Sequence, residues 1–348
     1  MGVVKATPEA IARAAELIRR GKLVAFPTET VYGLGADALN PEAVARIFEV
    51  KRRPRFDPLI VHIADPREVE GLCERVGERA RLLMEKFWPG PLTLVLPKRR
   101  KVPEIVTAGL PTVAVRMPDH PVALELIRRA QTPIAAPSAN PFGYLSPTTA
   151  EHVYEQLGEQ IELILDGGPC RVGVESTIVD LTGEEPELLR AGGVPVEELE
   201  RVLGREIRVS REGDRPRSPG QLPKHYSPRT PIQLAEPGQA AHTQLPEGKR
   251  VGLLLFRAPG VALEGFAHVE VLSERGEPRE AAANLFAALH RLDRAGLDLI
   301  VAELAPEEGL GLAINERLRK AASSFKRAGF GTPSARADDK RKIRGDPG

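Results

Sequence analysis

The first helix that the chain predicts has one apolar face, formed by Ala10, Ile11, Ala14, Leu17 and Ile18. Thr7 is a favourable N-cap, Pro8 suits the first helical position, and Gly21 follows the end of the helix. The mostly apolar run 22–26 that comes next is typical of a short buried strand. The chain therefore opens with a helix followed by a strand.

Helix and strand patterns then alternate as far as about residue 205. Helices are predicted at about 41–52, at two places within 66–88, at 120–130 and at 195–203. Strands are predicted at 59–63, 92–96, 112–117, 133–136, 161–165, 176–181 and 187–190. Several of these strands are too close in sequence for the crossovers that parallel neighbours need, so we expect an α/β domain with a mixed sheet.

The next part of the chain changes composition. Residues 207–231 combine prolines with arginines and lysines, as solvated linkers do. The segment 219–228, PGQLPKHYSP, is richer in histidine, tyrosine and lysine than a spacer requires. A second unit follows, with strands predicted at 249–256, 266–272 and 298–304 and helices at 277–295 and 312–328, as in a small open parallel sheet. The tail from Gly331 lacks apolar periodicity and is predicted to be disordered.

Composition excludes several classes of protein. A net charge of +1 means that any binding of phosphate or nucleic acid must come from local clusters. Two distant cysteines argue against a disulfide framework, and seven histidines without an HExxH motif argue against a histidine-built metal site. No segment approaches the length of a membrane span, so we expect a cytoplasmic protein. The chain has no Walker A motif, and its loose GxGxxA at 33–38 starts too far from the preceding strand for a dinucleotide fold.

Polar side chains gather where the first buried strand ends. Thr28, Glu29, Thr30 and Tyr32 follow Phe26 directly, and this is typical of a ligand site at the carboxyl edge of a sheet. Alone, the segment is equally an ordinary polar loop.

Cations and one histidine follow in other elements. Lys51 and Arg53 end a helix, where they either complement its dipole or clamp phosphates. His62 lies in an apolar strand, where a histidine is more often structural than a ligand. Arg116 alternates with valines, and a buried arginine needs a carboxylate from the protein or from a substrate.

Hydroxyl groups complete the candidate set. Ser138, Asn140 and Ser146 suit either nucleotide binding or capping of a helix near Thr149. Ser176 begins a buried strand without a GxSxG motif, so it is not expected to be a nucleophile, and Arg190 ends the next strand. Hydroxyls and cations with few free carboxylates favour binding and activation of anions over acid/base cleavage.

These motifs occur together in one order: FPTETVYGLGADA, KRRP, DPLIVHIAD, WPGPLT, TVAVRMPDHP, PIAAPSAN, GVESTIVD, LLRAGG and PGxxxxHYxP. Over about residues 1–330 the chain closely resembles the L-threonylcarbamoyladenylate synthases of the long, two-domain form. The resemblance implies a YrdC-like domain at 1–206 with a twisted open mixed sheet, a linker at 207–231 that folds over the active site, a Rossmann-like α/β domain at 232–330 and a tail at 331–348.

The resemblance also implies a reaction. L-threonine, bicarbonate and ATP with Mg²⁺ would give threonylcarbamoyl-AMP and pyrophosphate, without a covalent enzyme intermediate. A separate transferase would then modify adenosine 37 of tRNAs that read ANN codons, and stable tRNA binding by this chain is not expected.

Site residues are carried over only where the motifs match. The resemblance assigns threonine binding to Thr30, Tyr32, His62, Arg116, Ser176 and the backbone of Ala136. It assigns ATP binding to Lys51, Arg53, Asp57, Thr112, Ser138, Asn140, Ser146, Arg190 and Tyr226, with charge stabilisation by Lys51, Arg53 and Arg190 and no metal-ligating side chain. Two positions depart from the pattern: Asp57 stands where asparagine is common, and Gln221-Leu222 replaces a methionine followed by a basic or polar residue.

Two other functions stay open. YrdC-like domains resemble RNA-binding folds, although the near-neutral charge and 4% aromatic content weaken that interpretation. A YrdC-like module of a hydrogenase maturase would carry acylphosphatase and zinc-finger segments, which this chain lacks.

Overall fold

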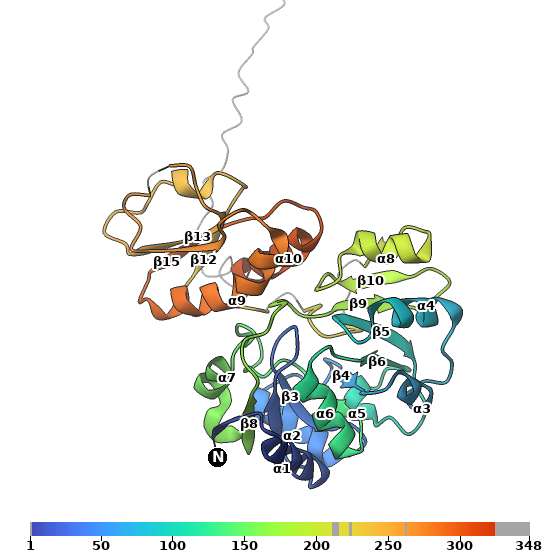
Figure 1. The fold of residues 1–348 in the computed structure, drawn as a ribbon. Coiled ribbons are helices and arrows are strands. Elements are labelled where there is room, and N and C mark those ends of the chain that lie inside the picture. Colours follow the sequence, from blue (N-terminus) through green and yellow to red (C-terminus); the bar gives the residue numbers. More distant parts are fainter. Residues whose placement is uncertain (1, 211–215, 223–224, 262, 324–348) are drawn as a thin grey trace, which may run out of the picture.

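The computed structural model describes residues 2–210, 216–222, 225–261 and 263–323. They form two α/β units that lie against each other (Figure 1). The predicted tail, the end of the predicted last helix at 324–328, and parts of the linker at 211–215 and 223–224 lie outside the described residues. Within the described residues, no helix is both long enough and apolar enough to cross a membrane.

The larger unit contains an 11-stranded sheet among the described residues. Its strands, in spatial order, are β1 (Val3–Lys5), β8 (Leu163–Asp166), β2 (Val24–Phe26), β3 (Gly33–Asp37), β7 (Ile134–Ala135), β4 (Ile60–His62), β6 (Thr112–Arg116), β5 (Leu92–Pro97), β9 (Thr177–Asp180), β10 (Glu187–Arg190) and β11 (Arg208–Val209). Strands β4 and β6 are parallel, whereas β5 and β6 are antiparallel. The predicted mixed sheet is therefore confirmed.

Helices of the larger unit start and stop largely where the sequence predicts. They are α1 (Pro8–Arg19), α2 (Pro41–Lys51), α3 (Val69–Leu72), α4 (Glu78–Phe87), α5 (Glu104–Thr107), α6 (Pro121–Ala130), α7 (Ala150–Leu157) and α8 (Val196–Leu203). Thr7 caps α1 by accepting a hydrogen bond from the Ala10 amide, and Pro8 begins the helix. Helix α2 ends at Lys51 because Arg52 takes a left-handed conformation before Arg53 and Pro54.

Strand β3 is absent from the elements that the sequence predicts, because glycines are uncommon in strands. It pairs antiparallel with β2, so that Gly33 lies opposite Phe26 and Gly35 opposite Val24. A Cβ atom on Gly35 would come within 2.7 Å of the Phe26 ring and 2.8 Å of Ile134. These glycines therefore allow close packing within the sheet rather than a phosphate-binding turn.

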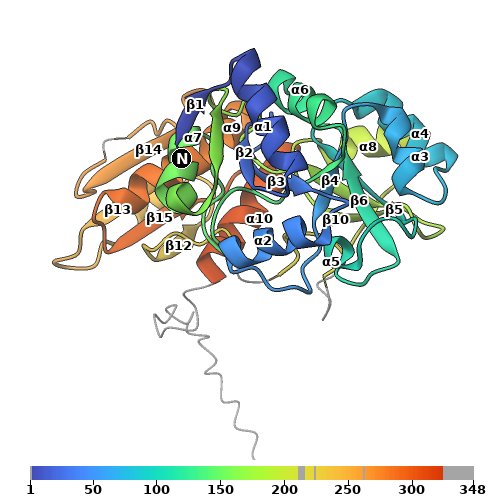
Figure 2. The same cartoon turned by 90° about the horizontal axis from the view of Figure 1, so that it is seen from below.

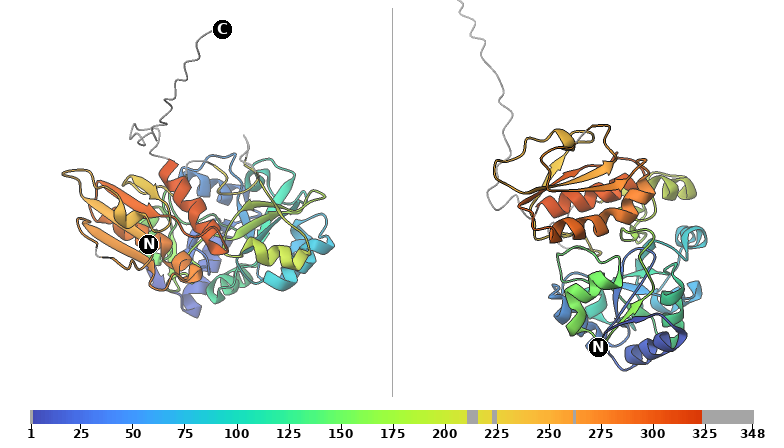
Figure 3. Two further views of the ribbon diagram at one scale, coloured as in Figure 1. Left: turned by 90° about the horizontal axis from the view of Figure 1, so that it is seen from above. Right: turned by 60° about the vertical axis from the view of Figure 1, so that its left-hand side comes forward.

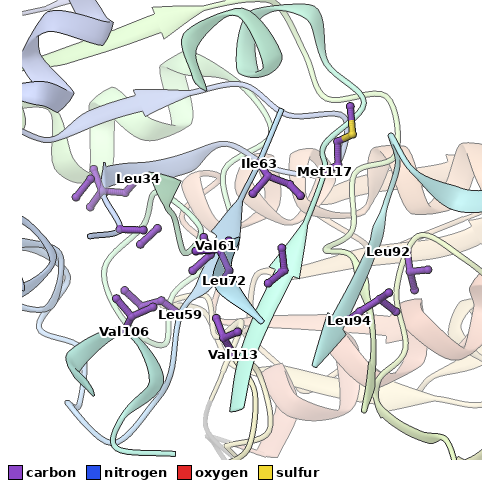
Figure 4. Close-up of a cluster of buried hydrophobic side chains, with 14 of the residues drawn as sticks. Leu34, Leu59, Val61, Ile63, Leu72, Leu92, Leu94, Val106, Val113 and Met117 are labelled. Carbon is purple, nitrogen blue, oxygen red and sulfur yellow. The ribbon is translucent and has the colours of Figure 1, made fainter. Parts of the chain in front are cut away.

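Side-chain alternation divides the larger sheet into two faces. Leu59, Val61 and Ile63 point into the main apolar core, which the helix α2 and its neighbours cover (Figure 4). Val113 and Val115 of β6 join this core. The intervening residues, among them His62 and Arg116, therefore belong to the opposite face. Helices α1 and α6 cover part of that opposite face, beside β2 and β8.

The smaller unit is a parallel sheet with two helices. Its strands, in spatial order, are β12 (Ile232–Ala235), β15 (Leu299–Glu303), β13 (Val251–Arg257) and β14 (His268–Ser273). Helices α9 (Pro278–Arg294) and α10 (Leu310–Ser323) lie between this sheet and the larger unit (Figures 1 and 3). Figure 2 shows the two groups of strands on opposite sides of the molecule.

The two units share one apolar cluster. Val31, Leu145 and Val174 of the larger unit pack with residues of α9 and α10. Gly173 lies so close to α9 that a Cβ atom there would come within 2.4 Å of the backbone of Ala282. Close backbone contact of this kind holds the smaller unit against one face of the larger one.

A pair of buried histidines lies in the same interface. The rings of His152 (α7) and His290 (α9) stack with centroids 4.0 Å apart, and a His290 nitrogen is 3.2 Å from the Ser146 carbonyl oxygen. Burial, with nearby positive charges that include Arg294, lowers the pKa of His152 to about 3. Burial also lowers the pKa of His290 to about 4. Both rings are therefore neutral in the folded protein near neutral pH.

These histidines predict that the protein loses stability as the pH falls. An unfolded histidine has a pKa of about 6.5, so below that pH the unfolded chain takes up protons that the folded chain refuses. We expect a loss of up to about 2 kcal/mol per histidine between pH 7 and pH 5. Denaturant unfolding at both pH values checks this: His290→Gln should reduce the loss by up to about 2 kcal/mol, and exposed His242→Gln should not change it. Equal slopes in all three proteins would contradict the interpretation.

Candidate active site

A small cavity in the larger unit collects many of the predicted site residues. Its volume is about 40 Å³. Its wall includes these members of the predicted threonine set: Thr30, His62, Arg116, Ala136 and Ser176. From the predicted ATP set it includes Arg53, Ser138 and Arg190. Residues far apart in the sequence therefore meet at one place.

Strand pairing explains why His62 and Arg116 meet. His62 of β4 and Arg116 of β6 are direct partners in the parallel pairing, so both side chains point to the same face of the sheet. His62 is the last residue of β4 and Arg116 the last of β6, so the cavity lies on this face at the carboxyl ends of the strands, as the sequence predicts. The loop 27–32 crosses the same region and contributes Thr28 and Thr30, whose hydroxyl oxygens are 2.9 Å apart.

Arg116 already has a protein partner. Its Nη2 atom is 2.6 Å from Oε1 of Glu29, and both side chains are buried. Arg116 also lines the cavity, so its guanidinium contacts both Glu29 and the interior of the cavity. Since a guanidinium has five N–H donors, one carboxylate does not exhaust it. Arg116 is therefore suited to hold a second carboxylate inside the cavity.

His62 is the neutral polar group of the same wall. Burial, and next the positive charge of Arg116, lowers its pKa to about 3. Its Nδ1 atom is buried and has no hydrogen-bond partner among the described residues. Buried polar atoms are normally paired. A neutral ring with an unpaired nitrogen, beside Arg116, is a natural contact for a small polar ligand.

Ser176 and Arg190 form a second polar group. The Ser176 hydroxyl oxygen is 2.7 Å from that of Thr93. Arg190 donates to the Ser176 carbonyl from Nε at 3.0 Å and from Nη2 at 2.9 Å, and Nη2 lies 3.1 Å from Oγ. Arg190 also donates to the carbonyl of Pro219 in the linker at 3.3 Å. It therefore connects the start of β9 with the linker.

Lys51 lies outside the wall of the cavity and fixes the backbone of the wall residue Ser138. It is buried, and its Nζ donates to the Ser138 carbonyl at 2.5 Å and to the Asn140 carbonyl. Burial, and next the charge of Arg53, lowers the pKa of Lys51 well below its usual value. Arg53 differs, because its Nη2 lies 2.9 Å from a carboxylate oxygen of buried Asp57. Asp57 thus pairs with Arg53 and is outside the wall of the cavity.

The balance of charge around the cavity is uneven. Arg53 pairs with Asp57 and Arg116 pairs with Glu29. Lys51 and Arg190, both buried, form no ion pair among the described residues. An uncompensated buried charge is costly unless a ligand or another group neutralises it. This part of the site is therefore suited to an anion.

The other predicted residues lie around the cavity rather than in its wall. Tyr32 is buried in the helix-covered core, and its hydroxyl donates to the Gly168 carbonyl at 2.7 Å. Asn140 donates to carbonyls of its own loop, and Ser146 donates to Glu175 at 2.5 Å. Thr112 starts β6, at the end of the strand away from Arg116. The N-cap of α7 is Thr149 and not one of the serines or Asn140.

The linker forms part of the site. Pro219 and His225 belong to the wall of the small cavity. Tyr226 is fully buried behind His225, with ring centroids 3.9 Å apart, and has a positive φ of 60°. Burial, and next the cations Arg53 and Lys320, keeps the pKa of His225 well below its usual value. The aromatic pair of the linker is therefore uncharged.

A second, larger cavity adjoins the first. Its volume is about 430 Å³, and it shares Arg190 with the small cavity. Linker residue Gln221 and α10 residue Lys320 also line it. In the linker, Pro219 therefore borders the small cavity and Gln221 borders the larger one.

Two acidic residues of the site were given no role from the sequence. Glu29 was seen only as one acid in a polar loop, yet it pairs with Arg116. Glu175 lies in the cavity wall and is 6% exposed. Burial alone would raise the pKa of Glu175, but the charges of Arg317 and Arg190 outweigh it and lower that pKa. A carboxylate at the start of a buried strand was the available signal for Glu175.

Two families match consecutive parts of the chain. Residues 16–192 match the family described as Telomere recombination, and residues 194–323 match the one described as Threonylcarbamoyl-AMP synthase, C-terminal domain. The boundary between the matches falls before α8, within the larger unit.

Relatives of similar length are also found. The threonylcarbamoyl-AMP synthase of Pyrococcus abyssi is 49% identical over 322 residues, which cover 88% of this chain and 92% of that protein. The Bacillus subtilis protein of the same name is 46% identical and covers 90% and 92%. The crystal structure of P. abyssi Sua5 complexed with L-threonine superposes with a TM-score of 0.82 at 48% identity, over 90% of this chain and 94% of that one.

Proposed function

The chain belongs to the threonylcarbamoyl-AMP synthase family, and we propose that it converts L-threonine, bicarbonate and ATP into L-threonylcarbamoyladenylate and pyrophosphate. The observation that carries this proposal is the cavity itself. It brings Arg116, which is suited to a carboxylate, and the neutral His62 together with Arg190, a buried cation without a carboxylate partner among the described residues. That arrangement suits an amino acid next to a polyphosphate.

Threonine would occupy the side of the cavity near β4 and β6. Arg116 would hold its carboxylate while keeping Glu29 as a second partner. His62, Thr30 and Ser176 are neutral hydrogen-bonding groups in the same wall and suit the amine and hydroxyl of threonine. The substrate amine would then face the open part of the cavity, where bicarbonate can reach it.

The phosphates of ATP would lie near Arg190, Lys51 and Arg53. Lys51 and Arg190 have no carboxylate partner among the described residues, so a polyphosphate would neutralise them. Ser138 lines the cavity, and Lys51 fixes the backbone of Ser138 and Asn140. ATP is far larger than a cavity of 40 Å³, so we expect linker residues Pro219 and His225 to move when it binds.

The reaction would proceed by positioning and charge stabilisation. The threonine amine condenses with bicarbonate to a carbamate with loss of water, a carbamate oxygen attacks the α-phosphate in line, and pyrophosphate leaves. Arg190, Arg53 and Lys51 stabilise the charge that develops on the phosphates. Carbamates and acyl adenylates decompose in water, which gives the enclosed cavity a chemical purpose.

Magnesium would arrive with the nucleotide. Within the described part of the chain, no three His, Cys, Asp or Glu side chains gather as a metal site. Mg²⁺ is often held through substrate phosphates with few protein ligands. The hydroxyl and cationic side chains of this cavity fit a metal that is bound mainly by the phosphates of ATP. Bound to ATP, it would neutralise phosphate charge alongside the arginines.

The product would pass to a transferase that modifies tRNA. The matches over both units favour this enzyme over an RNA-binding module. We expect weak, salt-sensitive tRNA binding at most, because the chain carries a net charge of only +1.

The test is pyrophosphate release from ATP with each co-substrate omitted in turn. Release is expected only when threonine and bicarbonate are both present, and serine or valine in place of threonine should support less of it. ATP turnover independent of threonine, or no turnover beside tight tRNA binding, would reject the synthase function.

A further inference from the structure

Arg317 of α10 reaches from the smaller unit into the wall of the active site. It is 0% exposed. Its Nε and Nη2 atoms each lie 3.0 Å from Oε2 of Glu175, and its Nη1 donates to the Ala191 carbonyl at 2.6 Å. Both contacts are with the larger unit, which α10 faces in Figure 1. This buried ion pair, with the Nε hydrogen bond to the carboxylate, fixes the position of the Glu175 side chain relative to α10.

Glu175 links Arg317 to the site. It lines the cavity next to Ser176, and its other carboxylate oxygen accepts a hydrogen bond from Ser146 at 2.5 Å. Among the described residues, Glu175 forms an ion pair only with Arg317. The negative charge of the site wall is therefore neutralised by a residue of the other unit.

This neutralisation affects Arg190. Arg190 is attracted to Glu175 but forms no ion pair with it among the described residues, and donates to carbonyls and a hydroxyl instead. Without Arg317, a buried carboxylate would need another cation, because an unpaired buried charge is costly. Arg190 lines the same cavity as Glu175 and feels its charge, so it is the cation that would replace Arg317. Arg317 thus keeps Arg190 available for an anion.

The remaining contacts of Arg317 point to the same part of the site. Its guanidinium carbon lies 5.4 Å from the centre of the Tyr226 ring, and Ala191, whose carbonyl it binds, directly follows Arg190. Its described contacts do not include Thr30, His62 or Arg116. Arg317 therefore reaches the site through Glu175, next to Arg190, and among the described residues it has no direct contact with those of β4 and β6.

We propose that Arg317 is a positioning residue supplied by the smaller unit, which neutralises Glu175 and so keeps Arg190 free to bind the phosphates of ATP. This inference rests on the proposed function. It gives the smaller unit a direct part in the reaction, beyond packing against the larger one.

The experiment measures pyrophosphate release by the full chain as a function of ATP and of threonine. Arg317→Gln should raise the KM for ATP about tenfold or more and lower kcat, while the KM for threonine stays within about twofold. Glu175→Gln keeps the shape and the oxygen that accepts from Ser146 but removes the charge. The double variant should therefore recover much of the affinity for ATP, which a merely structural role of Arg317 would not produce.

Two further variants complete the test. Arg291→Gln removes an arginine–carboxylate ion pair, with Glu270, that lies within the smaller unit, and it should leave both KM values unchanged. Arg317→Lys keeps the charge and covers the case in which Arg317→Gln does not fold, and it should lose less affinity for ATP. Equal losses for ATP and threonine, or no recovery in the double variant, would overturn the inference. An inactive wild-type protein would instead reject the proposed function.

Discussion

Replacing Arg116 by alanine is expected to raise the KM for threonine about a hundredfold, equivalent to about 3 kcal/mol, while ATP binding stays close to wild type. Arg116 is 4% exposed, lines the cavity and lies beside His62 in the parallel pairing of β4 and β6. It is the strongest donor to a carboxylate on this side of the cavity. Its loss removes the charge that would fix the amino acid and leaves the phosphate side intact.

Glu29 has to be considered in the same experiment. Arg116→Ala leaves the buried carboxylate of Glu29 unpaired, which costs about 3–5 kcal/mol of folding stability. The variant is therefore compared with Glu29→Gln and with the double variant Arg116→Ala/Glu29→Gln, which removes the stranded charge. The KM for threonine should rise in both proteins that lack Arg116 and should stay close to the wild-type value in Glu29→Gln.

The measurement is pyrophosphate release against threonine concentration, with nucleotide binding followed separately by calorimetry. If the double variant folds as stably as wild type and its KM for threonine is unchanged, Arg116 does not hold the substrate. If the affinity for ATP falls as much as the affinity for threonine, Arg116 has a structural role.

Replacing Arg190 by methionine is expected to lower kcat by about 10²–10³-fold. Methionine keeps much of the aliphatic length of arginine, but it removes a buried cation that has no carboxylate partner among the described residues. Charge that develops on the phosphates in the transition state would lose this stabilisation. The KM for threonine should change much less, because Arg116 and His62 are untouched.

Arg190 also donates hydrogen bonds to the carbonyls of Ser176 and of the linker residue Pro219. The loss of these contacts has to be separated from the loss of charge at the phosphates. Arg190→Lys restores the charge without the guanidinium fork and should regain part of kcat but not the contacts with both carbonyls. Unfolding midpoints of the two variants report the structural part. A methionine variant with unchanged kcat would show that Arg190 does not act on the reacting phosphates.

Local sequence patterns were sufficient to predict most elements of the fold. Thr7, Pro8 and Gly21 bound α1 as predicted, since capping depends on residues within one turn. The alternation of Arg116 with valines correctly indicates its burial. Strand β3 was missed because glycine disfavours strands in isolation, and its reason lies in the packing of Gly35 on Phe26, which is a tertiary contact.

The placement of the site was harder to predict than its composition. Which face of the sheet His62 and Arg116 point to, and that they lie side by side, depends on strand register, and register follows from the whole sheet. Tyr32 shows the same limit, since its position in the motif did not reveal that its hydroxyl is used by Gly168. The pairing of Glu175 with Arg317 joins residues 142 positions apart, and no local pattern marks it.

The most direct test of the account is the mass of the nucleotide product formed from ATP, threonine and ¹³C-bicarbonate. The account predicts threonylcarbamoyl-AMP that carries a single ¹³C atom and appears in step with pyrophosphate. Threonyl-AMP without the label, or ADP and phosphate in place of an adenylate, would contradict it.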